Sequence, residues 1–170
     1  MPRRLLVLLA AGLFWVGAVT GFFTAPSASG GGSDSTYTVI TLALANGRAV
    51  LTLAAGVVTL GATTFVGLVS SGYLFGAGVA ASTLSVRFIA YLVPHGIIEF
   101  PALWLAGAAG LRAPLWASAY LRDIERPPPV EVVRRSILDT AFAVVLITVA
   151  AVIELHITPV VADAIASLHK

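Results

Sequence analysis

The stretch VPHGIIEFP, residues 93–101, places a histidine and a glutamate four positions apart in an otherwise almost wholly apolar run. Pro94 suits the first turn of a helix, where backbone N–H groups lack intrahelical partners, so the sequence predicts that a helix begins here. On that helix His95 and Glu99 share one face, where they can share a proton, a cation or a hydrogen bond. An ionised group in lipid costs about 2.5 to 3.5 kcal/mol unless it is paired or hydrated. The role of His95 and Glu99 therefore depends on whether this run lies in lipid.

Composition places the run in a membrane. Of the 170 residues, 58% are hydrophobic and 11% are charged, and the mean hydropathy is +0.97. These values lie far from those of soluble domains. Because a span needs roughly 20 apolar residues, the length allows about five spans joined by short loops. The sequence therefore predicts a single all-α integral membrane domain, a polytopic transmembrane helical bundle, without a sizeable soluble catalytic domain.

Residue content argues against several kinds of chemistry. The chain has no cysteine, and so no disulfide, thiolate nucleophile or cysteine-based metal site. No serine occupies a Gly-x-Ser-x-Gly turn, and no basic patch interleaved with aromatic residues suggests nucleic acid as a partner. We therefore expect a protein that is not an enzyme, with no catalytic residue, cofactor or metal assigned.

Five apolar runs are the predicted spans, at residues 5–23, 49–69, 73–93, 95–111 and 137–157, with a charged loop at residues 112–136. Short interfacial or re-entrant helices are predicted at residues 37–45, before the Asn46-Gly47 pair, and at residues 115–124.

The first apolar run has two interpretations. A basic start and a small-residue exit up to residue 28 also fit a cleaved signal peptide. The run is longer than the roughly 7 to 15 residues of a signal-peptide core, which favours a retained span.

Arginine distribution predicts the orientation. Two arginines precede the first run, five lie in residues 112–136, and none lies in residues 24–35, the loop after the first span. Because basic loops stay cytoplasmic, the N-terminus and the charged loop should be cytoplasmic and the C-terminus outside the cell membrane. Six polar residues then face the outer half of the membrane, where they can neutralise one another in an interior network: Arg48, Arg87, His95, Glu99, Glu154 and His156.

Three interpretations of His95 and Glu99 stay open: a polar clamp between helices, a proton or ligand site, and a metal site. A metal needs at least three ligands, and this pair lacks the second histidine of the HExxH pattern, so Glu154 or His156 would have to complete the set. The clamp is favoured. Glycines such as Gly72 and Gly76 further predict close helix packing and a homodimer formed through small-residue faces.

Residues 93–112, VPHGIIEFPALWLAGAAGLR, resemble the signature of the stage II sporulation protein M family, a Pro-His-Gly-x-x-Glu-x-Pro element before a helix rich in small residues. Weaker similarities follow in order at residues 19–23, Asn46, residues 71–76 and residues 151–159, although Ser71 stands where asparagine is common. The resemblance implies a multi-spanning protein without established catalytic activity. The namesake works with peptidoglycan-degrading partners during engulfment, and relatives occur in bacteria and archaea that form no spores.

Two functions from different classes follow. The favoured one is a scaffold in the lipid bilayer that recruits other membrane or envelope proteins, or remodels the membrane. The alternative is a small-molecule or ion permease whose site is the outer His/Glu/Arg cluster, with an intramembrane hydrolase as a distant third.

Overall fold

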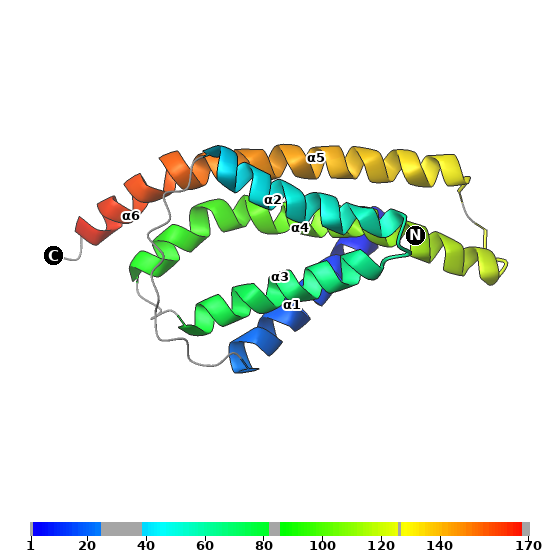
Figure 1. The fold of residues 1–170 in the computed structure, drawn as a ribbon, viewed down its shortest axis with the longest axis horizontal. Helices are drawn as coiled ribbons and strands as arrows, with labels where there is room; N and C mark the ends of the chain where they lie inside the picture. Colours follow the sequence, from blue (N-terminus) through cyan, green and yellow to red (C-terminus); the bar gives the residue numbers. More distant parts are fainter. Residues whose placement is uncertain (1, 25–38, 82–85, 126, 168–170) are drawn as a thin grey trace.

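The computed structural model describes residues 2–24, 39–81, 86–125 and 127–167, and the regular structure in these ranges is helical throughout (Figure 1). The elements are α1 (Arg3–Thr24), α2 (Val39–Ala54), the 3-10 turn η1 (Ala55–Val57), α3 (Ala62–Ala81), α4 (Val86–Leu121), α5 (Pro129–His156) and α6 (Thr158–Ser167). The all-α prediction is confirmed.

Three of the described helices, α1, α3 and α5, are long and apolar enough to cross a membrane. This agrees with a multi-pass membrane protein, whereas the count of five spans stays a prediction. The helices α1 to α5 alternate in direction (Figure 1). One end of the molecule holds the N-terminus, the α2–α3 turn and the α4–α5 connection, and the opposite end holds α6. We call these the N-terminal end and the α6 end.

Helix α4 corrects two predicted boundaries. It runs for 36 residues through Pro94 and Pro101, so no helix begins at Pro94. It also continues past residue 111 to Leu121, so the predicted loop at residues 112–136 shrinks to a connection before Pro129. A proline removes one helical hydrogen bond and bends the helix, and packing against neighbouring helices lets the helix continue. Figure 1 shows α4 as a curved helix lying along α5.

The predicted span at residues 49–69 is also wrong, because it contains a turn between α2 and α3. Leu60 and Gly61 adopt φ values of 50° and 86°, and only glycine takes such values without strain. The turn is fixed by the hydroxyl of Thr64, which donates a buried hydrogen bond of 2.6 Å to the carbonyl oxygen of Leu53. The segment from residue 39 to 54 is one helix, with Asn46-Gly47 inside it.

Glycines join α1 to α3. A Cβ on Gly72 would overlap the carbonyl oxygen of Phe14, and one on Gly76 would overlap that of Ala18. Gly17 and Gly21 on α1 meet the α3 backbone in the same way. Close packing through small residues is thus confirmed, but within the chain. Because α1 covers this face, the prediction of a homodimer loses the surface on which it was based.

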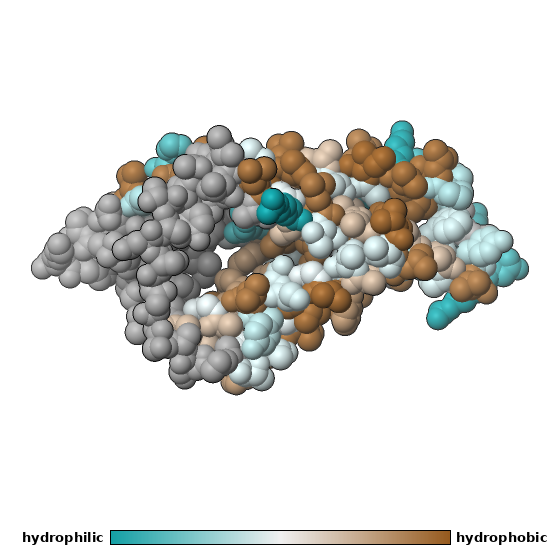
Figure 2. All heavy atoms as spheres, viewed as in Figure 1, coloured by the Kyte–Doolittle hydropathy of each residue, from teal (hydrophilic) through white to brown (hydrophobic). Residues whose placement is uncertain are grey.

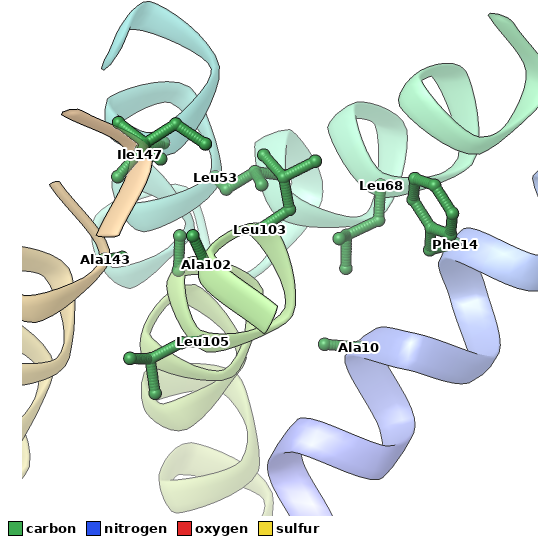
Figure 3. Packing of buried hydrophobic residues seen from close by; sticks show 11 residues of the cluster. Ala10, Phe14, Leu53, Leu68, Ala102, Leu103, Leu105, Ala143 and Ile147 are labelled. Carbon is green, nitrogen blue, oxygen red and sulfur yellow. The ribbon is translucent and has the colours of Figure 1, made fainter. Parts of the chain in front are cut away.

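Helix α4 lies at the centre of the apolar core. Figure 3 shows Ala102 of α4 beside Ala143 of α5, and Leu103 of α4 directed toward α2 and α3. Phe14 of α1 is 1% exposed, and its ring lies 5.3 Å from that of Phe100. Beyond α5, the predicted tail from Thr158 is instead the helix α6, which packs against α4 and begins with Thr158-Pro159, a favourable place for proline.

Candidate functional site

The structure brings together two of the six predicted polar residues. Glu99 on α4 and Glu154 on α5 are both partly buried, and their carboxyl groups are close enough to interact electrostatically. Both lie toward the α6 end, because the two helices run side by side in opposite directions (Figure 1). Carboxyl groups on neighbouring helices in a membrane are candidate ligands for a proton or a cation.

The other four predicted residues are not placed in this cluster. Arg48 is exposed within α2, not at the start of a span, and His156 is exposed at the end of α5. Among the described side chains, no ion pair joins Arg48 to Glu99 or Glu154. Arg87 and His95 belong to α4, but their side chains lie outside the described part of the chain.

The metal interpretation is not decided by these positions. Over the described residues, no three His, Asp or Glu side chains are grouped closely enough to hold a metal ion. His95, on which the interpretation depended, is not among those side chains, so the choice between a clamp, a proton site and a metal site stays open.

A second polar group, which sequence reasoning missed, lies at the N-terminal end. Asp139 of α5 is 7% exposed and accepts a hydrogen bond from the guanidinium of Arg112 on α4. Its other oxygen lies 2.8 Å from Nη2 of Arg3 on α1. We call Arg3, Arg112 and Asp139 the arginine–aspartate cluster. It joins three helices through charges, of which Arg112 and Asp139 are largely removed from water.

Neighbouring hydrogen bonds support this cluster. Ser136, one turn before Asp139, donates a buried hydrogen bond of 3.1 Å to the carbonyl oxygen of Ala109. Trp116 donates a 2.8 Å hydrogen bond to the carbonyl oxygen of Pro127, which ties the α4–α5 connection back to α4. The sequence does contain a signal for Asp139, since a carboxylate near the start of an apolar run needs a partner.

Much of the described surface is apolar. Figure 2 shows hydrophobic residues along the body of the molecule, with several hydrophilic residues at the end that carries the α4–α5 connection. On α5 the exposed apolar side chains extend over several turns: Ile137, Leu138, Phe142, Val145, Val149 and Val152. A surface of this kind faces lipid or another apolar protein surface.

Comparisons with known proteins agree with these features. The family model described as Stage II sporulation protein M matches residues 9–159. An uncharacterized protein from Methanocaldococcus jannaschii is 31% identical over 122 residues, which cover 69% of this chain and 68% of that protein. No solved structure matches the chain at a significant level.

Proposed function

The chain belongs to the stage II sporulation protein M family, and from this premise we propose that it is a non-enzymatic membrane scaffold that recruits other membrane or envelope proteins. The N-terminal end faces the cytoplasm in this proposal, as the arginine distribution predicts, and the C-terminus lies outside. The multi-pass assembly then presents a fixed set of helices to its partners.

The observation that supports this proposal best is that the buried polar side chains bond the helices to one another. The arginine–aspartate cluster joins α1, α4 and α5, while Ser136 and Thr64 add buried hydrogen bonds between segments. These contacts stiffen the bundle and leave an apolar α5 face exposed. A rigid helix with an exposed apolar face can dock another transmembrane helix with little loss of conformational entropy.

The same face is the surface that we propose for self-association. The glycine face of α3 is covered by α1, so a homodimer has to use another helix. The exposed apolar side chains of α5 extend over several turns and can form such an interface. A second copy of the chain would then compete for this face with a different membrane partner.

The second candidate function is a permease, and one observation favours it. Glu99 and Glu154 lie on adjacent helices, α4 and α5, and both side chains are partly buried. Such a pair at the α6 end is a reasonable binding site for a proton or a small cation. Transport would additionally require a path through the bundle, which the scaffold function does not.

Reconstitution into liposomes tests the choice between these functions. We expect no protein-dependent flux of protons or monovalent cations above that of empty vesicles, and no difference between the wild-type chain and Glu99→Gln. Glu131→Gln, at a partly exposed carboxylate in the first turn of α5, is the matched control. A flux that Glu99→Gln abolishes and Glu131→Gln retains would replace the scaffold with the permease.

Partner recruitment is tested in cells by crosslinking. Phe142→Gln and Val149→Gln change the α5 face two turns apart, where the side chains are 54% and 44% exposed. We expect these variants to lose specific crosslinked partners, including any second copy, whereas Glu99→Gln retains them. Leu8→Gln places the same polar group on the exposed surface of α1 and should change little. An identical crosslinking pattern in all variants would count against docking through α5.

A further inference from the structure

A cavity of about 610 Å³ lies at the N-terminal end, between the start of α1, the last turns of α4 and the first turns of α5. The α4–α5 connection closes one side, where the carbonyl oxygen of Pro127 is held by Trp116. Its volume falls within the range of sites that bind small molecules, roughly 300 to 1,000 Å³. All three residues of the arginine–aspartate cluster form part of its lining.

The polar lining of the cavity is mainly cationic. Four arginines line it, against the two carboxylates of Asp139 and Glu125: Arg3, Arg112, Arg122 and Arg135. Asp139 already forms ion pairs with Arg3 and Arg112. Arg112 keeps unused donor capacity, since its Nη1 is buried without a hydrogen-bond partner among the described residues. Guanidinium groups arranged in this way suit an oxyanion, and phosphate in particular.

The rest of the lining is apolar, which narrows the class of ligand. Leu6 of α1, Leu115 of α4, and Val132 and Leu138 of α5 form these walls. A free phosphate ion would gain no binding energy from contact with leucine side chains. A ligand that carries an anionic group beside a hydrocarbon part matches both halves of the lining.

The position of the cavity favours a lipid as that ligand. Arg3 is the first residue of α1, and Val132 lies in the first turn of α5, so the cavity is at the ends of two helices able to cross a membrane. The indole of Trp116, which also lines it, stacks with the ring of Tyr120 at a centroid distance of 5.9 Å. Trp and Tyr are enriched at the membrane–water interface, the depth of lipid headgroups.

We propose that this cavity binds the phosphate headgroup of an anionic phospholipid, with the arginines around the phosphate and the acyl chains beside the leucine side chains. The site adjoins the exposed apolar face of α5 at Leu138, and the proposal does not depend on the scaffold function. A lipid held here would connect α1, α4 and α5 at the same level as the arginine–aspartate cluster.

Lipid binding by the purified full chain tests the proposal. Nanodiscs or detergent micelles are supplied with equal amounts of phosphatidylglycerol and phosphatidylcholine, and the lipid that stays bound is measured by native mass spectrometry. We expect preferential retention of phosphatidylglycerol. Arg135→Gln removes a charge from the cavity and should weaken that retention about fivefold, the effect expected of one arginine near a lipid phosphate.

Arg134→Gln is the matched control. Arg134 and Arg135 are neighbours on α5, both exposed and both bonded to Glu131, but only Arg135 lines the cavity. Either variant removes one charge and one contact to Glu131, so a loss confined to Arg135→Gln identifies the cavity. Equal losses, or equal retention of the two lipids by the wild type, would overturn the proposal. Displacement of the lipid by millimolar inorganic phosphate would do the same by assigning the site to a soluble anion.

Discussion

Replacing Asp139 by leucine is expected to lower the free energy of unfolding by about 3 to 5 kcal/mol, the usual cost of leaving one partner of a buried ion pair alone. Asp139 is the carboxylate that holds both Arg112 and Arg3. Without it, the guanidinium of Arg112, of which 11% is exposed, keeps its charge and lacks a counter-charge. Denaturant titration of the purified protein in micelles, followed by circular dichroism, measures the loss.

The double variant Arg112→Leu/Asp139→Leu separates the pair from a simple packing defect. Because a buried ion pair is often replaceable by apolar side chains, the double variant should recover most of the stability that Asp139→Leu loses. Glu131→Gln serves as the control, since among the described residues Glu131 pairs with two exposed arginines and its loss should matter little. Stability losses that simply add in the double variant would show that Arg112 and Asp139 are not coupled.

This ion pair illustrates where sequence reasoning stopped. Hydropathy assigns Arg112 to the charged loop at residues 112–136, because the apolar run before it ends at residue 111. Its partner lies 27 positions later, inside another predicted span. Hydropathy describes each segment separately and carries no information on which helices lie side by side. The helical class and the family were within reach of the sequence, whereas this contact between helices required the fold.

The turn between α2 and α3 was missed for a related reason. Residues 57–61 are Val-Val-Thr-Leu-Gly, so hydropathy continues through the turn without a polar break. Thr64 and Gly61 provide the hydrogen bond and the positive φ that the turn uses. Conversely, Ser70-Ser71-Gly72 looks like a break and lies in the middle of α3. In apolar helices, glycine more often allows close packing than ends the helix.

That role of glycine leads to the second large effect, at Gly72. The variant Gly72→Ala should destabilise the protein by about 1 to 3 kcal/mol, the typical cost of forcing an extra group into a filled site. The added methyl group would meet the carbonyl oxygen of Phe14, which is backbone and cannot rotate away. Helices α1 and α3 would have to separate along the interface where Gly17, Gly21 and Gly76 also hold them close.

Gly78→Ala makes the same chemical change two turns further along α3, where a Cβ would have no neighbour within 4 Å. There the gain in helix propensity, up to about 1 kcal/mol, acts without a clash, so the variant should be neutral or slightly more stable. The two substitutions therefore have opposite expected signs in the same denaturant titration. If both substitutions stabilise the protein, the result contradicts the close packing of α1 against α3. In that case the α3 glycine face would again be free for association between copies of the chain.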